Sequence, residues 1–518
     1  MPQGTLSSSP WRVALSMSLI SLPPFAFWCL AVPGPSSLFY LIGNLLALLS
    51  VSLTVTKILH YIPSPSIFMY LKLRFQSETL QQTVAVIQIV ISLGVLFFYL
   101  MFTSSLLSAI SKFPFYLLAP LIASLSLLTT VFAGQAMLML PVFFIFLACL
   151  TAGCGIFIYF GLEEVASFSE IVTFQFSFYK IVASLVIGFF MGFYQLAAGQ
   201  SMYQMYFSLS TRHKLRLCLS LHAAFLVFLS SFTFLIAQIF THFLQEHCRL
   251  SYSAASLLEF IRFTVPRAQF LSFFVSVSLV LLLMFAYQWI FVGLVSTIWE
   301  EFLKPHFKEW PQVQQLCALQ ATALKVTVTL ILLSLGVGLS PVSYAKFLPI
   351  SFYILLSFAA LVTGCFACGY FLPFTNLKGC FAGLALCGAL IFSTFWANIA
   401  KNPLPKLENN CTAHLFDEYQ ILDDGQHGVF YNTMADFPLD FVPLFLTMVF
   451  TLVCVVVSGV SGWQDLFAID WNLIVWPCCL SNTLSATTFR KRRPFVESDS
   501  FRYAQSDASG TGPRPQLH

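Results

Sequence analysis

The acidic residues of this chain are confined to a few short stretches. One carboxylate, Glu78, occurs in the first 162 positions, and none occurs between Glu309 and Glu408. All 21 Asp and Glu residues lie between or after long apolar segments. A charged side chain in hydrocarbon is costly, so this distribution is typical of a chain that crosses a bilayer many times. It also leads us to exclude ion coupling through a buried Asp or Glu.

Composition supports the same class, because 58% of the residues are hydrophobic and only 9% are charged. Soluble domains carry about 25% charged residues. A helix needs about 20 largely apolar residues to cross the bilayer, and its backbone groups must pair within the segment. We therefore predict an all-α polytopic membrane protein with about 12 transmembrane helices. The qualifying segments are 11–31, 36–58, 81–110, 114–132, 138–161, 172–198, 217–243, 268–298, 322–340, 347–372, 377–400 and 441–462.

The loop charges predict that both termini are cytosolic. Lys and Arg gather in the loops that would then face the cytosol and in the tail, as the positive-inside rule requires. Three Arg residues in the fourth outer loop count against the rule. The same topology puts the sequon at Asn410 outside, where it can be glycosylated. It also leaves Cys248 and Cys411 in outer loops, where a disulfide between them is conceivable.

The spans divide into two groups of five and a final pair. Because five is odd, the two groups must have opposite orientations in the membrane, which is the arrangement of an inverted repeat. The predicted parts are a cytosolic N-terminus (1–10), a first five-helix repeat (11–161), a second repeat (172–372), two further helices with a glycosylated outer loop at 401–440 (377–462), and an interfacial segment with a cytosolic tail (463–518).

Interrupted helices at the middle of the membrane often hold a transported solute. Pro23 and Pro24 stand at the centre of the first span, and two prolines remove two backbone donors. A plain kink is the alternative, but we favour a true break there. In the sixth span, Gly188 and Gly192 allow either a hinge or a close helix crossing, and the crossing is the somewhat stronger interpretation.

A few polar side chains lie within the predicted spans. Gln88, Gln195 and Gln288 each require a partner in hydrocarbon, and for each the bonding of one helix to another is the more common role. The pair Tyr287 and Gln288 is the most ligand-like, because it combines an aromatic ring with an amide. Together with the prolines and glycines, these residues form the candidate substrate site.

Four short motifs occur in a fixed order along the chain. They are YLKLRF at Tyr70–Phe75, QSMYQMYFS at Gln200–Ser208, EEFLKP at Glu300–Pro305, and GYFLP at Gly369–Pro373 followed by NLKG at Asn376–Gly379. In this order they resemble the sodium:solute symporter family, in its multivitamin and monocarboxylate branch. The resemblance covers about residues 11–462, and it implies a LeuT-like core that moves a small organic solute by alternating access.

The same resemblance implies a sodium site, but the residues at its positions are unusual. The first-span positions are Leu19 and Leu22, which can offer only backbone carbonyls. Counting back from Glu300 without gaps, the two hydroxyl positions of the eighth span are Phe285 and Ala286. The site is therefore expected to be degenerate, with Na⁺ left as a conceivable coupling ion. The chain also lacks the family's leading extra helix, and Met205 replaces the Arg of a family motif.

Three kinds of function remain open. The first is a carrier of a monocarboxylate-like or vitamin-like solute, the second a non-transporting sensor or structural relative, and the third a lipid-handling or channel-like protein. No motif indicates an enzyme or binding to nucleic acid; the expected partners are the solute and the lipid bilayer. The sequon and the basic inner loops suit the plasma membrane. An open pocket near Pro23, Gly192 and Gln288 would favour the carrier, whereas a pocket filled by Phe side chains would favour the sensor.

Overall fold

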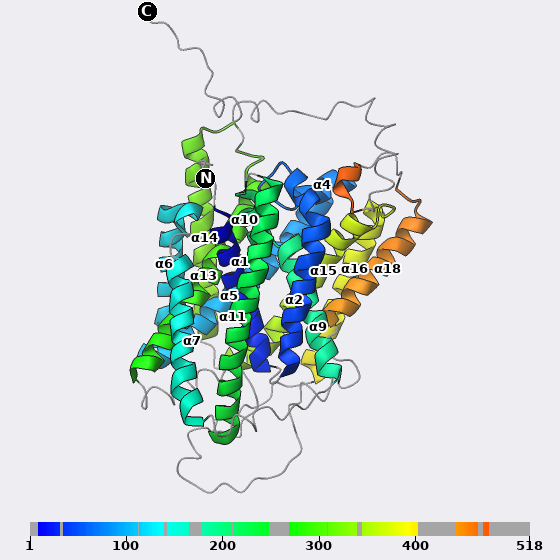
Figure 1. The fold of residues 1–518 in the computed structure, drawn as a ribbon. Helices are drawn as coiled ribbons and strands as arrows, with labels where there is room; N and C mark the ends of the chain where they lie inside the picture. The colour runs from blue at the N-terminus through cyan, green and yellow to red at the C-terminus, as the bar shows by residue number, and fades with distance from the viewer. Residues whose placement is uncertain are drawn as a thin grey trace, which may run out of the picture.

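The regular elements of the computed structural model are all helical within the residues that it describes (Figure 1). The predicted glycosylation site Asn410 and the cysteines Cys248 and Cys411 lie outside these residues. The described ranges are 9–31, 35–111, 113–138, 142–164, 178–209, 211–247, 269–307, 309–338, 344–401, 442–464 and 470–475.

The first helical unit begins with a long helix, and its second helix continues through a π-helical turn. A short helix, α4, lies between its second and third membrane helices. The elements are α1 (Pro10–Ala31), η1 (Pro35–Ser37), α2 (Leu38–Ser50), η2 (Val51–Val55), α3 (Thr56–Tyr61), α4 (Met69–Phe75), α5 (Glu78–Ser111), α6 (Phe115–Leu138) and α7 (Val142–Glu164).

The second unit is followed by two further helices. Its elements are α9 (Phe178–Phe193), η4 (Tyr194–Ala198), α10 (Gln200–Phe207), α11 (Arg212–His247), α13 (Gln269–Ile298), η5 (Trp299–Leu303), α14 (Gln312–Gly338) and α15 (Tyr344–Phe371). The last elements are α16 (Leu377–Lys401), α18 (Val442–Val460) and a short 3-10 turn, η8 (Trp471–Leu473).

The helices have the length and composition of membrane spans. In the described part of the chain, 8 helices are long and apolar enough to cross a bilayer. Shorter apolar stretches lie within α6, α7, α15 and α16, which are 23 to 28 residues long in full. Helix α5, with 34 residues, is about 50 Å long at 1.5 Å per residue, so it extends beyond a hydrocarbon core of about 30 Å. The chain is thus a multi-pass membrane protein.

Helix contacts reveal the inverted repeat. The helices of the two units can be matched in order: α1 with α9–α10, α2 with α11, α5 with α13, α6 with α14, and α7 with α15. If the units are repeats, two helices that touch should have counterparts that also touch. The contact of α2 with α9 becomes that of α11 with α1, and both are extensive. The contact of α7 with α13 becomes that of α15 with α5, which also occurs. The pairs α5–α13 and α6–α14 are their own counterparts.

The prediction of a break at Pro23 and Pro24 is wrong, because α1 is one helix from Pro10 to Ala31 with both prolines inside it. The break lies instead in the other unit, where Gly199 separates η4 from α10 with ψ of 119°. The segment from Gln200, which lies beyond the predicted sixth span 172–198, is the second half of that interrupted helix.

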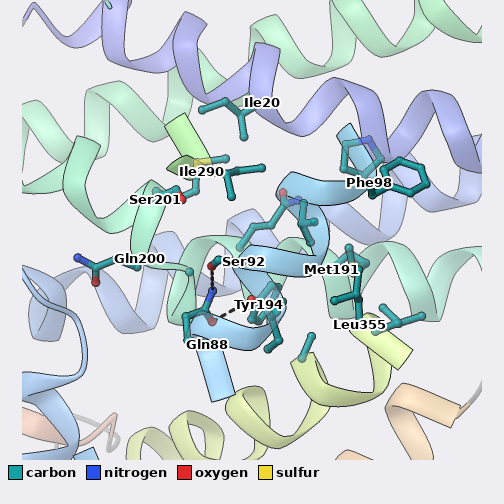
Figure 2. A pocket seen from close by; sticks show the side chains of 18 of the residues that line it. Ile20, Gln88, Ser92, Phe98, Met191, Tyr194, Gln200, Ser201, Ile290 and Leu355 are labelled. Carbon is teal, nitrogen blue, oxygen red and sulfur yellow. Dashed lines mark hydrogen bonds between the residues drawn. The ribbon is translucent and has the colours of Figure 1, made fainter. Parts of the chain in front are cut away.

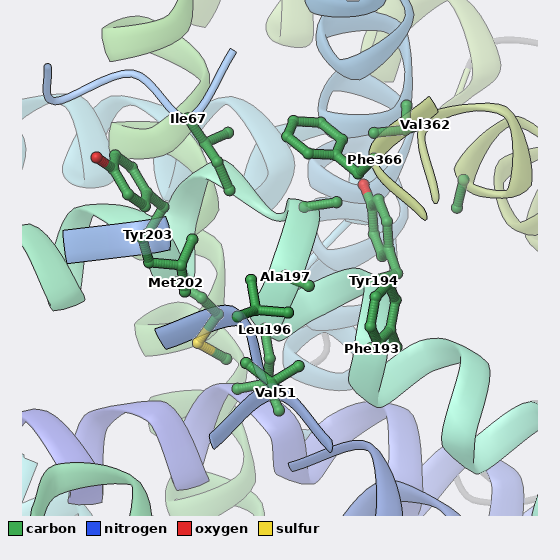
Figure 3. Close-up of a cluster of buried hydrophobic side chains, with 14 of the residues drawn as sticks. Val51, Ile67, Phe193, Tyr194, Leu196, Ala197, Met202, Tyr203, Val362 and Phe366 are labelled. Atoms are coloured by element: carbon green, nitrogen blue, oxygen red, sulfur yellow. The ribbon is translucent and has the colours of Figure 1, made fainter. Parts of the chain in front are cut away.

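Near this break, η4 and α10 pack against η2, α15 and the connection between α3 and α4. Figure 3 shows the apolar cluster at this place, with Ile67, Leu196, Met202 and Phe366 among its members. Side chains from both repeats thus share one core. The backbone can leave the helical path at Gly199 because neighbouring groups there bond to α10.

A buried arginine joins three elements at the same end of the bundle, which we call the α4 end. The guanidinium of Arg74 donates to the carbonyls of Leu372 (3.1 Å) and Pro373 (2.9 Å) just after α15, and to Oε1 of Gln464 (2.6 Å) after α18. A cation is favourable there, because unpaired carbonyls give a helix C-terminus partial negative charge. The η8 turn also packs at the α4 end, where Tyr70 donates to the carbonyl of Leu473 (3.1 Å).

One carboxylate of the described residues is buried, although the exclusion of ion coupling through such a group stays a prediction. Glu301, in η5 at the α4 end, is 4% exposed. It accepts hydrogen bonds from Ser66 and Gln81, and no ion pair links it to Lys or Arg among the described residues. The sequence could not show this burial, because the covering residues come from a distant loop and from α5.

Candidate functional site

A cavity of about 140 Å³ lies between the first helices of the two repeats (Figure 2). Ile20, Pro24 and Phe27 of α1 line one side of it, and Met191, Tyr194 and Gln195 of α9 and η4 line another. Further walls come from α5, α10, α13 and α15. An engineered protein cavity of about 150 Å³ binds benzene, so this space suits a molecule of about one small ring.

Polar groups are gathered on one wall. The hydroxyl of Tyr194 donates to Oε1 of Gln88 at 2.9 Å, and Nε2 of Gln88 donates to Oγ of Ser92 at 3.2 Å. Figure 2 shows this chain of bonds running from η4 to α5. An amide nitrogen has two hydrogens, so Gln88 retains a donor for a ligand. A pocket with a few oriented polar groups on an apolar surface can fix the orientation of a small solute.

Aromatic rings form another wall. The ring of Phe27 meets those of Phe98 and Phe102 edge-on, with centroids 5.1 Å and 5.0 Å away. Of the described residues that line the cavity, none carries a charge. A ligand with a net charge would therefore enter without a counter-ion, which is costly in an apolar site.

The two prolines of α1 change the backbone hydrogen bonding of this helix next to the cavity. Proline has no N–H, so the carbonyls of Leu19 and Ile20 lose their α-helical donors, Pro23 and Pro24. Ile20 loses the 3-10 donor as well, because Pro23 stands three residues after it. Ile20 lines the cavity, so α1 has a carbonyl without its helical donors at a residue of the cavity wall and without a break in the helix.

Of the predicted substrate-site residues, Pro24, Gln88 and Gln195 lie together at the cavity, and the others do not line it. Gly188 and Gly192 face α2 instead. A Cβ on Gly188 would lie 2.0 Å from the carbonyl oxygen of Tyr40, and one on Gly192 would lie 2.5 Å from Oδ1 of Asn44. The close helix crossing is therefore the role that the structure gives these glycines. Pro23 is buried, next to Pro24.

Tyr287 and Gln288 face away from the cavity, towards α6 and α14. Nε2 of Gln288 donates to Oγ1 of Thr129 at 2.8 Å, which joins α13 to α6. Tyr287 packs in an apolar cluster with residues of α5, α6 and α14, and its hydroxyl has no partner among the described residues. Gln288 thus has the helix-bonding role that we had considered more common.

The positions implied for sodium are apolar and buried. Phe285 is 2% exposed and Ala286 is 0% exposed, and neither has a side-chain oxygen. Phe285 belongs to the same apolar cluster as Leu19 and Leu22, and its ring lies 6.4 Å from that of Trp289. Sodium needs several oxygens in place of its water, so these four residues do not fit the ion.

Sequence reasoning missed the cavity residues Ser92, Tyr194, Gln200 and Ser201. Gln200 and Ser201 belonged to a motif that we had assigned only to the family resemblance. Gly199 directly before them was the available signal, because glycine commonly marks a place where a helix stops.

The chain is similar in structure to solved membrane transporters. No protein-family model matches it, and no curated protein matches it in sequence. One structure, the substrate-bound outward-open state of a Na⁺-coupled sialic acid symporter, aligns over 88% of this chain and 91% of its own, with a TM-score of 0.65 and 13% identity.

A second structure is Mhp1, a nucleobase-cation-symport-1 family transporter in a closed conformation with bromovinylhydantoin bound. It aligns over 88% of this chain and 92% of its own, with a TM-score of 0.51 and 11% identity. At such identities the likeness concerns the fold. The chain therefore has the LeuT-like fold, with two inverted five-helix repeats followed by two further helices.

Proposed function

We propose that this protein is a transmembrane carrier that moves a small organic solute by alternating access. The observation that carries the proposal is the cavity between α1 and η4, where the two repeats meet. Polytopic carriers commonly place their substrate at such a repeat interface. The proposal is also supported by the fold, which the chain shares with solved transporters.

The lining favours an uncharged solute with an apolar body and a polar edge. Gln88, Ser92 and Gln195 offer donors and acceptors, whereas Phe27 and Phe98 offer apolar surface. A monocarboxylate or a charged vitamin was the expectation from the family resemblance. Its carboxylate would be buried without Lys or Arg, so within the small organic solutes we favour neutral ones.

Transport independent of sodium is the second part of the proposal. Phe285 and Ala286 cannot supply the side-chain oxygens that the resembled family uses, and both are buried. A carrier of this kind would run down the gradient of its own solute. The plasma membrane is the proposed location, as the sequon at Asn410 and the basic loops suggest.

The test is uptake of labelled neutral ring compounds, sugars, vitamins and monocarboxylates into cells that express the chain, with Na⁺ or with choline in its place. We expect uptake of a neutral solute that is unchanged in choline. Gln88→Leu should reduce it at least tenfold, because the polar wall loses its amide. Thr129→Val, which breaks a bond of similar length outside the cavity, should keep most of the uptake.

Other outcomes would change the proposal in defined ways. Uptake that disappears in choline would show sodium coupling through residues other than Phe285 and Ala286. No uptake of any solute, with the protein present at the surface, would favour a non-transporting sensor. Equal losses in Gln88→Leu and Thr129→Val would contradict the cavity as the binding site.

A further inference from the structure

The connection between α3 and α4 is held by side chains of the opposite repeat. Residues 62–68 form no helix, and four consecutive residues, Ser64 to Ile67, are each bonded to α10 or η5. The holding residues are Gln200, Tyr203 and Glu301. We call these three side chains and Ser64–Ile67 the polar clamp.

The bonds of the polar clamp are short and specific. Tyr203 donates its hydroxyl to the carbonyl of Ser64 at 2.8 Å. The Gln200 amide makes two bonds to the loop: Nε2 donates to the carbonyl of Pro65 at 2.9 Å, and Oε1 accepts from the N–H of Ile67 at 3.0 Å. Ser66 donates to Glu301.

The three holding side chains of the polar clamp come from helical elements. Gln200 and Tyr203 lie one turn apart on α10, so both face the loop, and Glu301 is also held by Gln81 of α5. A tyrosine hydroxyl is protonated at neutral pH, so Tyr203 is a donor there. Ile67 anchors the loop in the apolar cluster that contains Met202 and Tyr203 (Figure 3).

Gln200 also belongs to the cavity, where it and Ser201 form part of the lining on the side of α10 (Figure 2). Gln200 is buried and is a member of both groups, so the polar clamp adjoins the cavity at this residue. A movement of α10 that a solute causes would act on the loop through the Gln200 amide. The loop belongs to the first repeat and α10 to the second, so the polar clamp joins the parts that must separate in alternating access.

The geometry points to the polar clamp as the gate that closes the cavity towards the α4 end, with Gln200 as the positioning residue that links the solute to the gate. This inference rests on the proposed carrier function. The basic residues of the adjoining loops predict that the α4 end faces the cytosol. The gate combines a few hydrogen bonds, each of which water can replace when the loop leaves, with the apolar contact of Ile67, which opening must also part.

The test measures access to the cavity without any solute. A reporter cysteine, Ser92→Cys, is placed in the cavity lining, and Cys317→Ser removes the one thiol that is exposed among the described cysteines. A charged, membrane-impermeant methanethiosulfonate is added to the α4 end in inside-out vesicles, and to the other side in right-side-out vesicles. Labelling of the same protein without Ser92→Cys is subtracted.

A matched pair of variants on α10 isolates the bond. Tyr203→Phe removes a hydroxyl that holds Ser64, whereas Tyr206→Phe removes a buried hydroxyl that has no partner among the described residues. We expect Tyr203→Phe to raise the labelling rate from the α4 end about fivefold, as the loss of one hydrogen bond would, and Tyr206→Phe to leave it unchanged. Gln200→Ala, which removes two bonds, should raise it further.

Equal labelling rates in Tyr203→Phe, Gln200→Ala and Tyr206→Phe would overturn the gate. So would a rise that occurs only from the side opposite to α4. Because the labelling needs no transported solute, a failure of the carrier proposal would leave this result intact. If the chain transports a solute but Tyr203→Phe and Gln200→Ala leave the labelling rate unchanged, the gate is wrong and the carrier proposal stands.

Discussion

The first helices of the two repeats differ in a way that their prolines do not suggest. Helix α1 contains two adjacent prolines and remains one helix, whereas α9, η4 and α10 contain none and are interrupted at Gly199. Both line the cavity. The comparison shows that a missing donor is not sufficient to break a helix. A break also requires groups nearby that bond the released segment, and the polar clamp provides them only for α10.

Bonds along α1 explain why it stays helical. Ser18 contacts Nδ1 of His222 on α11 at 2.8 Å, and Nε1 of Trp28 donates to Oγ of Ser184 on α9 at 3.0 Å. These bonds lie on both sides of the prolines and fix the direction of the helix. The φ of proline also fits a helix, so only its donor and the preceding turn are affected.

The largest expected effect concerns the crossing of α9 with α2. Gly188→Ala would place a Cβ 2.0 Å from the Tyr40 carbonyl oxygen, and two backbones cannot yield as a side chain can. We expect a loss of about 3 kcal/mol or more, seen as poor expression and a lower Tm of the purified protein. Gly336→Ala, with nothing within 4 Å of its Cβ, is the control and should not lower the Tm. Equal Tm values would show that α9 and α2 can separate freely.

The next prediction concerns the prolines themselves. Because α1 is already helical, Pro23→Ala and Pro24→Ala would return the missing donors to Leu19 and Ile20. Each change should stabilise the protein, by up to about 3 kcal/mol, and raise the Tm. A lower Tm for both would contradict this view and indicate that the prolines shape α1. Uptake should fall for Pro24→Ala if the free carbonyl of Ile20 binds solute.

A change at the break itself should have a somewhat smaller effect. A Cβ on Gly199 would lie 2.6 Å from the carbonyl oxygen of Gln195, in the π-helical turn before it. Gly199→Ala should therefore displace α10 and cost about 2 kcal/mol in stability. Thermal unfolding measures the cost, and cysteine labelling of the cavity measures the displacement. A normal Tm together with normal labelling would mean that the turn adapts and that the break does not need glycine.

These cases show what the sequence can predict. The membrane helices can be predicted from apolar segments of about 20 residues. A helix that crosses the hydrocarbon needs such a segment whatever its packing partners are. The inverted arrangement follows from two groups of five helices. Gln88 and Gln195 were recognised because amides are rare in such segments. Each of these features is local in sequence.

Tertiary contacts decide the features that were mispredicted or missed. The place of the break depends on what bonds α10, and the burial of Glu301 depends on Ser66 and Gln81. Gly188 and Gly192 could be assigned to a crossing only once α2 was seen beside them. The role of Gln288 depends on Thr129. No pattern within a single helix contains this information.

The smallest effects concern the bonds that join the two first helices directly. Ser184→Ala would leave the buried indole N–H of Trp28 unpaired, at a cost of about 1 kcal/mol, the usual scale for side-chain bonds between membrane helices. Ser21 donates to Oε1 of Gln195 at 3.4 Å, a long bond beside the cavity, so Ser21→Ala should change the Tm very little.

The two variants, Ser184→Ala and Ser21→Ala, distinguish two ways of joining α1 to the second repeat. If Ser184→Ala lowers the Tm and Ser21→Ala does not, the helices are fixed to each other at Trp28 and are free to move at the cavity, as a carrier requires. If instead Ser21→Ala lowers the Tm and Ser184→Ala does not, the helices are fixed to each other beside the cavity. That result would argue against their movement at the cavity.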